Sequence, residues 1–548
     1  MFVPFKSVIL LSFKLCTSSY QIELLLIMLL SGVPVQTDIA PVLELFAASF
    51  IVYLVSVATY NRYFHPLKDF PGPFWASITS LWYYRAIIAS KHDDYQLEIH
   101  RKYGPMVRLA PGHIQIADPE AIETIYGPKQ NFLKSHFYTP FDAKISPTPD
   151  TFVIRDDKTH TERRRAVAHI YTQAAVLEYE PCVDRVIDLF EKRMEQFVDS
   201  GEIVDIALWF RKYTFDVIGE MFYGKEGGLG FIRDNIDVNH WGQLLEVLTK
   251  PITAIAYVPY GLQSVVLLSQ LLFPETRAGV MGFLTVIRQS HSTLKQRLDD
   301  MAAKRPTNPN DGLSKLIVVA NAKDEKSKFS MLDVTAEIFA IIFAGSDTTS
   351  TALTAIFYFL HKHPQTLAKL HEEIDTAFAE GRVTYPIRFK DSNKLPYLRA
   401  VVNEATRLHP SIGLSLPRLV PPGGADICGK YFPGGYEVGI NAAVIQMDRK
   451  VFGDDADQFV PERWIRDGER ATARMERHIL QFGYGKRICM GKNIANTEMY
   501  KLLPTLLHKY NFELTGNKMW TVRREWFQQQ KNVNVTVSRR EARPARTE

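Results

Sequence analysis

The stretch FGYGKRICMG, residues 482–491, places one cysteine in a loop that is rich in glycine and in basic residues. Cys489 has no second cysteine, histidine or acidic residue close to it in the sequence that could share a metal ion. The glycines allow a tight turn and a close approach of the backbone to a flat ligand. Because the helical pattern KNIANTEMYKLLPTLLH follows the loop, we expect backbone N–H groups there to favour the thiolate of Cys489.

Three interpretations of this loop are open from its residues alone. A single thiolate fits the iron of haem, whose porphyrin already fills four positions, whereas zinc asks for three or four protein ligands. Arg487 would then suit a carboxylate on the haem. Most lone cysteines, however, are small buried hydrophobic residues. The sequence GYGKR also faintly resembles a phosphate loop, although the full spacing of glycine, lysine and hydroxyl residue is missing.

The composition is that of an ordinary globular protein, with 46% hydrophobic and 23% charged residues among 548. Lysine and arginine (65) barely exceed aspartate and glutamate (60), so the strongly basic balance typical of nucleic-acid binding is excluded. The cysteines are too few and too dispersed for a disulfide scaffold, which indicates a reducing compartment. They are Cys16, Cys182, Cys428 and Cys489.

The first 60 residues differ from the rest of the chain because they hold three apolar stretches. Only the third, at about 42–60, approaches the ~20 residues that span a bilayer, and Glu44 is its one charge. Aromatic and positive residues typical of the cytoplasmic interface follow it, in a proline-rich hinge at 61–75. We therefore predict a membrane anchor; a buried helix or a signal peptide is the alternative. The other two stretches are Phe2–Leu15 and Leu24–Val35.

Beyond the hinge, residues 76–538 predict one large, mostly helical domain with a small amount of sheet, and 539–548 a basic, solvated tail. Amphipathic patterns predict the helices and short alternating runs predict the strands. Examples are the helical patterns Val183–Phe197 and Leu360–Phe378 and the strand patterns Pro105–Ala117 and Asn532–Ser538.

Two further motifs contain charged residues at defined spacings. In NEATRLHP, Glu404 and Arg407 are three apart on a helical pattern, where their side chains can pair. The motif FVPERW, residues 459–464, contains Arg463. Taken alone, the first two residues are an ordinary surface pair that contributes only a few tenths of a kcal/mol.

The internal segment Glu337–Leu360 is apolar enough to resemble a membrane span, but it has a polar cluster, AGSDTT, at its centre. Asp347 lies in that cluster, and a carboxylate at mid-bilayer costs at least ~2.5 kcal/mol. We therefore predict a helix buried within a large protein. The hydroxyl of Thr348 could divert a backbone hydrogen bond and open the helix locally.

These motifs resemble those of the cytochrome P450 family. The loop fits the family's haem-binding pattern Phe-x-x-Gly-x-Arg-x-Cys-x-Gly at every defined position, and the other motifs follow in the family's order. The resemblance implies that Cys489 is the axial ligand of haem b. The residues that carry the pattern are Phe482, Gly485, Arg487, Cys489 and Gly491.

The resemblance gives the charged motifs a structural role. Glu404, Arg407 and Arg463 would form a buried triad beneath the haem loop, although tryptophan follows Arg463 where phenylalanine is often found. Removing one of them would leave a buried charge unpaired and cost several kcal/mol.

The same resemblance assigns proton delivery to Asp347 and Thr348, at a point where Gly345 would leave room for oxygen. It also assigns contacts with the haem propionates to three residues outside the loop. They are His160 and Arg164, four apart in HTERRRAVAHIY, and Arg418 in SLPRLV.

The implied fold is mainly α with a small β region, preceded by the anchor helix. YNRYFHPLKDFPGP and FGDDADQFVPERW resemble fungal microsomal P450s of the pisatin demethylase-like group, which act mostly in secondary metabolism or detoxification. The implied activity is NADPH-driven mono-oxygenation by a single-pass protein of the endoplasmic reticulum membrane with its catalytic domain on the cytosolic side. A separate NADPH-cytochrome P450 reductase would bind a basic face made by Lys486, Lys492 and Arg163–Arg165.

The substrate is expected to be a lipophilic small molecule, because the segments predicted to border the pocket are rich in aliphatic and aromatic residues. These segments are Tyr126–Asp150, Pro251–Phe273, Ile412–Leu416 and Trp526–Phe527. Two other classes stay open: a haem-thiolate isomerase or dehydratase that needs no dioxygen, and a non-enzymatic haem-binding membrane protein.

Overall fold

The computed structural model describes residues 40–541 apart from Lys91, 323–328 and 517–519. The chain divides after Tyr63 into two units, Met1–Tyr63 and Phe64–Glu548. The apolar stretches Phe2–Leu15 and Leu24–Val35 lie outside the described residues.

In the first unit, helix α3 spans Ala40–Thr59, and a π-helix, η1, follows at Tyr60–Phe64. Two helices among the described residues are long and apolar enough to cross a membrane, Glu44–Phe64 and Met331–Lys362. None of the first apolar window is buried, whereas 72% of the second is buried inside the protein. The internal apolar segment is thus a core helix, as predicted, and the membrane anchor stays a prediction.

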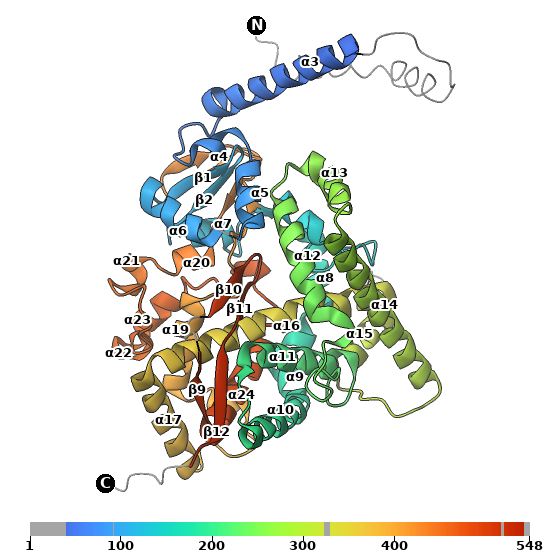
Figure 1. The fold of residues 1–548 in the computed structure, drawn as a ribbon, viewed down its shortest axis with the longest axis vertical. Coiled ribbons are helices and arrows are strands. Elements are labelled where there is room, and N and C mark those ends of the chain that lie inside the picture. Colours follow the sequence, from blue (N-terminus) through green and yellow to red (C-terminus); the bar gives the residue numbers. More distant parts are fainter. Residues whose placement is uncertain (1–39, 91, 323–328, 517–519, 542–548) are drawn as a thin grey trace. The chain divides into compact units, whose positions relative to one another are not determined.

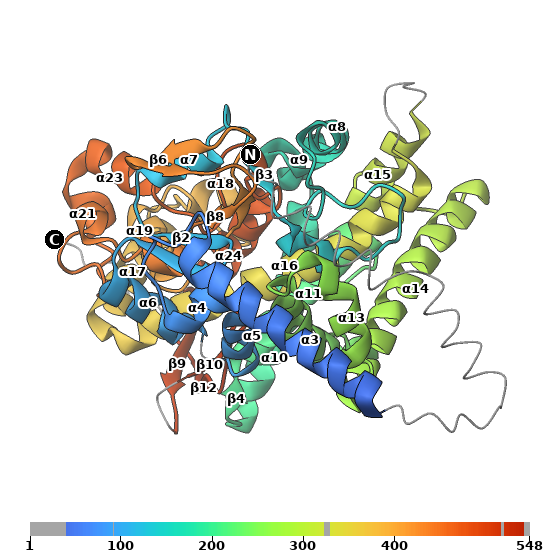
Figure 2. The same cartoon turned by 90° about the horizontal axis from the view of Figure 1, so that it is seen from above.

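The second unit is mostly helical, and the long helix α16 passes through its middle (Figures 1 and 2). Its helices are α4 (Phe74–Ile78), α5 (Leu81–Ile88), α6 (His92–Tyr103), α7 (Ala121–Tyr126), η2 (His136–Phe141), α8 (Asp157–Val167), η3 (Ala168–Tyr171), α9 (Gln173–Glu178), α10 (Glu180–Ser200), α11 (Ile206–Tyr223), η4 (Val238–His240), α12 (Trp241–Ala256), α13 (Tyr260–Gln270), α14 (Pro274–Ala302), α15 (Gly312–Asn321), α16 (Met331–Lys362), α17 (Pro364–Ala379), α18 (Phe389–Ser392), α19 (Pro396–Leu408), α20 (Ala442–Ile445), α21 (Arg449–Phe452), α22 (Arg463–Arg466), α23 (Gly468–Glu476), η5 (Gly485–Arg487) and α24 (Lys492–Lys509).

Within the described residues, short strands form four small sheets, of which the largest has the order β1-β2-β8-β5-β3. Within it β2 and β8 are parallel and the other neighbours are antiparallel. The other sheets are β4-β12-β9, β10-β11 and β6-β7. The strands are β1 (Met106–Ala110), β2 (His113–Ile116), β3 (Leu133–Lys134), β4 (Val204–Asp205), β5 (Arg418–Leu419), β6 (Ala425–Ile427), β7 (Lys430–Phe432), β8 (Glu437–Gly439), β9 (Tyr510–Leu514), β10 (Thr521–Arg524), β11 (Gln528–Lys531) and β12 (Asn534–Arg539).

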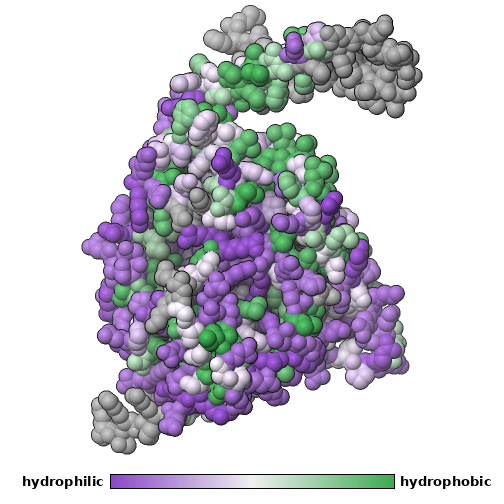
Figure 3. Space-filling view, viewed as in Figure 1, coloured by the Kyte–Doolittle hydropathy of each residue, from purple (hydrophilic) through white to green (hydrophobic). Residues whose placement is uncertain are grey.

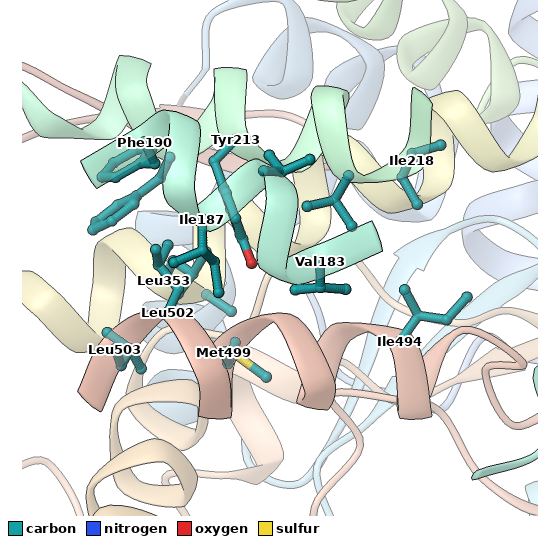
Figure 4. Close-up of a cluster of buried hydrophobic side chains, with 14 of the residues drawn as sticks. Val183, Ile187, Phe190, Tyr213, Ile218, Leu353, Ile494, Met499, Leu502 and Leu503 are labelled. Carbon is teal, nitrogen blue, oxygen red and sulfur yellow. The ribbon is translucent and has the colours of Figure 1, made fainter. Parts of the chain in front are cut away.

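The main core lies where α10, α11, α16 and α24 pack together (Figure 4). Helix α10 contributes Val183, Ile187 and Phe190, which recur every three or four residues on one face and are fully or almost fully buried. Side chains of α11 and α24 interleave with them, including Tyr213 and Met499. This core packs α16 against α24, the helix that follows the cysteine loop.

Helix α16 begins with a capping box. The Oγ of Ser330 accepts the N–H of Asp333 at 3.4 Å, and the Asp333 carboxylate accepts the N–H of Ser330 at 2.6 Å. The helix ends at Lys362, and α17 begins at Pro364. The predicted helical pattern Leu360–Phe378 is therefore confirmed from Pro364 onward, whereas its first residues belong to α16, because proline cannot continue a helix but suits its first turn.

Part of the proline-rich segment predicted as a hinge at 61–75 is packed, because the N–H of Arg108 in β1 donates to the carbonyl of Pro71 at 2.8 Å and Leu67 is fully buried. One predicted boundary needs correction. The tail does not start at 539, because Arg539 still belongs to β12. Arg540 is also fixed, since its guanidinium donates to Asp375 Oδ1 at 2.8 Å.

Candidate active site

The cysteine loop is a compact turn between α23 and α24. The N–H of Cys489 donates to the carbonyl of Phe482 at 2.8 Å, which closes the loop across the intervening glycines. Gly485 has a φ of +59° and lies so close to the carbonyl of Tyr126 in α7 that a Cβ atom would clash with it. Glycine is therefore required at this position by the packing of the loop on α7.

Cys489 is exposed to solvent on one side, while protein atoms surround the rest of its side chain. Burial raises the pKa of this thiol, while the N–H groups of Gly491 and Lys492 and the charge of Arg164 act in the opposite direction. The expected N–H groups are thus present, but burial outweighs them. A metal ion at the sulfur would reverse this balance, since a coordinating thiol is deprotonated.

Helix α8 packs its basic residues against the loop. Arg164 donates from Nη1 to the carbonyl of Ile488 at 2.7 Å, directly beside the cysteine. Arg487 donates to the carbonyl of Ile154 and to Asp157 Oδ1, each at 2.7 Å. His160 is buried, and burial together with Arg487, Lys134 and Arg164 lowers its pKa to about 3. His160 and Arg164 therefore approach the same loop from one helix face, as their spacing predicts.

A second group of cations comes from the largest sheet. Lys134 of β3 lies directly opposite Arg418 of β5, and both side chains are buried. Arg418 donates from Nη1 to the Tyr138 hydroxyl at 3.0 Å, and Lys134 Nζ lies 4.3 Å from the centre of the same ring. Burial and the charges of Arg418 and Arg487 lower the pKa of Lys134 well below its usual value. The sequence analysis missed Lys134, although a lysine in the apolar run NFLKSHFY was a signal.

These residues form one basic cluster. Like charges directly opposite each other on paired strands are destabilising, and buried cations without a counter-charge are costly. In the described part of the chain, Lys134, Arg164 and Arg418 form no ion pair with a carboxylate. A flat ligand that brings a thiophilic metal to Cys489 and carboxylates to the cations fits this arrangement, and haem has both. The basic cluster consists of Lys134, His160, Arg164, Arg418 and Arg487.

The predicted triad is assembled and fully buried. Arg407 donates to both oxygens of Glu404 at 2.8 Å, and Arg463 donates to Glu404 Oε1 at 2.9 Å. Their remaining donors are bound to backbone carbonyls, for example that of Ala456 at 2.6 Å, and to Asp455 at 2.8 Å. The interpretation of Glu404 and Arg407 as a surface pair is therefore wrong.

Trp464 adds a fourth member to this group. Its indole N–H donates to Glu404 Oε2 at 2.9 Å. Phenylalanine at this position has no donor, so the tryptophan that sequence comparison presents as a mild departure makes a contact of its own. The backbone N–H of Val460 also donates to Glu404, at 3.0 Å.

Asp347 and Thr348, the predicted acid and alcohol, contact different parts of the protein from α16. The Thr348 hydroxyl donates to the carbonyl of Ala344 at 2.6 Å, yet the helix is continuous, so the expected local opening is absent from α16. Asp347 is completely buried and faces α11, where its Oδ1 accepts Arg211 Nε at 2.8 Å. Burial raises the pKa of Asp347, and Arg211 opposes this.

Gly345 serves helix packing. A Cβ atom there would lie 2.7 Å from the Cδ1 of Ile218 in α11. The expectation that this glycine leaves room for oxygen is corrected, because the space beside it is filled by Ile218.

The predicted basic face also loses a member. Arg163 is buried between α8 and α16, where its Nε donates to Glu337 at 3.0 Å and its Nη1 pairs with Asp333. Lys486 is held by Asp157 and by the carbonyl of Gln130. Its charge is therefore already engaged within the protein.

The four segments predicted to border a pocket come together. Phe137, Tyr257, Leu414 and Trp526 belong to one hydrophobic cluster. The Phe137 ring lies 5.2 Å from that of Tyr257 and 5.3 Å from that of Trp526, centroid to centroid. Phe152, whose ring centre lies 4.7 Å from Lys134 Nζ, makes an edge-to-face contact with Trp526 of the same group. The aromatic cluster therefore adjoins the basic cluster.

The sequence profile described as Cytochrome P450 matches residues 69–537. The chain belongs to the cytochrome P450 family. The match covers most of the second unit, and it agrees with the mainly helical fold and with the cysteine loop. The family is one of oxidoreductases with a haem-thiolate cofactor, so the non-enzymatic alternative is set aside.

Related P450s with curated names come from fungi. The chain is 38% identical to the cytochrome P450 monooxygenase gsfF of Penicillium aethiopicum, over 89% of this chain and 96% of that protein. It is 34% identical to the cytochrome P450 monooxygenase cicH of Emericella nidulans, over 87% and 95% of the two chains. A pisatin demethylase of Fusarium vanettenii is 32% identical, over 89% and 94%. The predicted resemblance to that group is confirmed.

Proposed function

We propose that this P450 inserts one oxygen atom of dioxygen into a lipophilic small molecule, with electrons from NADPH, in a step of fungal secondary metabolism. One dioxygen, one NADPH and one proton convert a C–H bond to C–OH, and water and NADP⁺ are released. The observation that carries the proposal is the pairing of the Cys489 loop with a basic cluster in which, among the described residues, only Arg487 forms an ion pair with a carboxylate. The fungal monooxygenases among the relatives support the reaction class.

Haem b, when bound, would supply the iron at which dioxygen is activated. Cys489 would hold the iron, and the loop hydrogen bond to Phe482 fixes the position of the sulfur. Arg164, Arg418 and Lys134 would bind the haem carboxylates, with Arg487 and His160 beside them. Asp347 and Thr348 would deliver protons from two faces of α16.

The substrate would lie against the aromatic cluster of Phe137, Tyr257 and Trp526, which adjoins the basic cluster. Aromatic side chains favour apolar or flat ligands because they offer large contact areas and stacking. Water would be excluded from the same region by these buried rings.

The electron donor would be NADPH-cytochrome P450 reductase. On the surface near α8 and the loop, Arg165 and Lys492 are exposed, and they remain in the proposed basic face after Arg163 is removed from it. Reversing the charge of both should slow reductase-driven turnover and weaken its salt dependence. Unchanged rates and salt dependence would contradict this surface.

The protein would be anchored in the endoplasmic reticulum membrane by α3, with the catalytic unit on the cytosolic side. Figure 3 shows hydrophobic side chains gathered over α13, and Leu268 of this helix and Leu272 just after it are exposed. Such a patch suits contact with membrane lipid. Removal of residues 1–60 should shift the protein from the membrane pellet to the soluble fraction in alkaline extraction. A truncated protein that stays in the pellet would contradict the role of this segment as the membrane anchor.

The first test is the carbon monoxide difference spectrum of the reduced protein beside that of Cys489→Ala. A strongly red-shifted band in the wild type that is lost in the variant supports thiolate-ligated haem. A histidine-type spectrum in well-folded wild type would overturn the proposal. The control is Cys428→Ala, because Cys428 lies in the turn between β6 and β7 and is not part of the cysteine loop.

A haem-thiolate isomerase or dehydratase is the second candidate, since it would share the thiolate loop. The presence of Asp347 beside Thr348 favours oxygen chemistry. Product formation that requires both NADPH and dioxygen supports the monooxygenase, and product formed without them supports the isomerase. In Thr348→Ala we expect continued NADPH consumption with less product and more peroxide.

A further inference from the structure

The carboxylate of Asp347 is bound on one side only. Its Oδ1 accepts Arg211 Nε at 2.8 Å, whereas Oδ2 is buried and has no hydrogen-bond partner in the described part of the chain. A buried carboxylate normally receives several hydrogen bonds. Asp347 is therefore held by a single charged residue, and that residue comes from another helix, α11.

Arg211 uses its guanidinium to join three elements. Besides Asp347 of α16, it binds Glu246 Oε1 of α12 at 2.8 Å through Nη1. Its Nη2 donates to the carbonyl of Gly242 at 2.7 Å. All three nitrogens are engaged in a planar fork, a geometry that lysine cannot reproduce.

The ion pairs continue from Glu246 to the surface. Lys531 of β11 donates to Glu246 Oε2 at 2.7 Å, and Arg523 of β10 lies 3.3 Å from the same oxygen. The Lys531 side chain is 46% exposed, whereas that of Asp347 is not exposed at all. The network thus runs from a buried acid to solvent through residues of α11, α12 and the β10–β11 hairpin.

From this geometry we infer that Arg211 is a positioning residue for proton delivery: it keeps Asp347 ionised and turned toward α11 between turnovers. The inference rests on the proposed function of Asp347. After Asp347 gives a proton to the oxygen site, it must take one back from water, and Arg211 stabilises the ionised form in between. The unpartnered Oδ2 is the atom left open to receive that proton.

The charges around Asp347 agree with this assignment. Burial raises the pKa of Asp347, and Glu246 acts in the same direction. Arg211 lowers the pKa most among the surrounding charges, and Arg523 adds to it. Without Arg211, a carboxylate in such a position favours its neutral form.

The first experiment measures the protonation of Asp347 directly. Infrared spectra of the full-length, haem-loaded ferric protein at pH 7.5 are compared for the wild type, Arg211→Gln and Arg211→Gln/Asp347→Asn. We expect a protonated-carboxyl band in Arg211→Gln that is missing from the wild type and from the double variant. The absence of this band in folded Arg211→Gln would overturn the inference.

The second experiment measures the fate of electrons. With purified reductase and NADPH and no added substrate, we expect Arg211→Gln to release several-fold more hydrogen peroxide per NADPH than the wild type, at the expense of water. Arg211→Lys keeps the charge but cannot bind both acids, so its peroxide fraction should be intermediate. Equal peroxide fractions in all three proteins would overturn the inference.

The matched control is Arg297→Gln. Arg297 forms a comparably buried pair with Asp311, at 2.7 Å, between α14 and α15. Arg297→Gln should lower the stability of the protein without changing its peroxide fraction. A rise in peroxide equal to that of Arg211→Gln would show that the effect is merely structural, and it would contradict the inference. If the wild type consumes no NADPH, the proposed function fails, and the infrared band alone then decides whether Arg211 holds Asp347 ionised.

Discussion

The triad around Glu404 and the basic cluster around Cys489 are both buried groups of charge, but their charges are neutralised differently. Glu404 receives five hydrogen bonds from four residues of this chain. In the basic cluster, cations from β3, β5 and α8 converge, and only Arg487 pairs with a carboxylate within the described residues.

This difference separates structure from binding. A buried charge that the protein itself satisfies stabilises one conformation, whereas a buried charge left over raises the energy of the ligand-free chain. The second kind is expected where a charged ligand completes the fold. The following predictions test the comparison, from the largest expected effect to the smallest.

Glu404→Gln should give the largest loss of stability. It leaves Arg407 without a carboxylate partner and Arg463 with Asp455 alone, which costs about 3–5 kcal/mol in the free energy of unfolding. Urea denaturation and the yield of soluble, haem-loaded protein measure the loss. A loss below about 1 kcal/mol in the free energy of unfolding would mean that the triad contributes no more than an ordinary surface ion pair, which would contradict the comparison.

Trp464→Phe should weaken the triad without dissolving it. The variant removes one donor to a charged acceptor, so we expect a loss of about 1.5 kcal/mol. Haem content in the remaining folded protein should be unchanged, because Trp464 touches Glu404 and not the basic cluster. A stability equal to that of the wild type would show that the indole contact adds nothing.

Lys134→Met should change stability and haem binding in opposite directions. Replacing a buried, unpaired cation by an apolar side chain should stabilise the haem-free chain by about 1 kcal/mol. Haem should leave several-fold faster, as measured by its transfer to a haem-scavenging protein. Lys158→Met, at an exposed position of α8, is the control. A variant that is less stable but keeps its haem would reverse the assignment of Lys134.

His160→Gln should have the smallest effect, visible only in the pH dependence. The pKa of His160 is about 3 in the folded protein and about 6.5 when unfolded, so the unfolded chain binds more protons below pH 6.5. Stability contributed by neutral His160 is therefore lost as the pH falls below 6.5, by at most about 0.8 kcal/mol at pH 6.

The measurement is urea denaturation of the haem-free chain at pH 7.5 and pH 6. Between these two pH values, the wild type should lose more stability than His160→Gln. With haem bound, the difference between the two losses should be smaller, because haem carboxylates near the imidazole ring would raise the pKa of His160. Equal losses of stability in the two haem-free proteins would mean that His160 is already protonated in the folded state.

The sequence predicted those parts of the site that lie in short motifs. Cys489 with its glycines, and Glu404 with Arg407, are local patterns whose spacing already fixes a loop or a helix face. The buried helix α16 was predictable as well, because a carboxylate in the middle of an apolar segment excludes a membrane span.

The remaining parts depend on contacts between distant residues. Lys134 meets Arg418 only because β3 and β5 pair, and Arg211 meets Asp347 across 136 positions of sequence. No periodicity within one segment reports such a pairing. Gly345 shows the same limit: its sequence motif suggested space for oxygen, whereas the tertiary structure places Ile218 there.

The four-residue arrangement at Glu404 restricts how this protein can change over evolutionary time. Each donor occupies a different direction around one carboxylate, so loss of Arg407 or Arg463 removes a cation that balances the buried charge of Glu404, whereas loss of Trp464 removes only a neutral donor. The effect of any one substitution therefore depends on the residues present at the other positions. Viable descendants can replace Trp464 alone, but they would have to keep Glu404 and its two arginines together or replace them in coordinated steps.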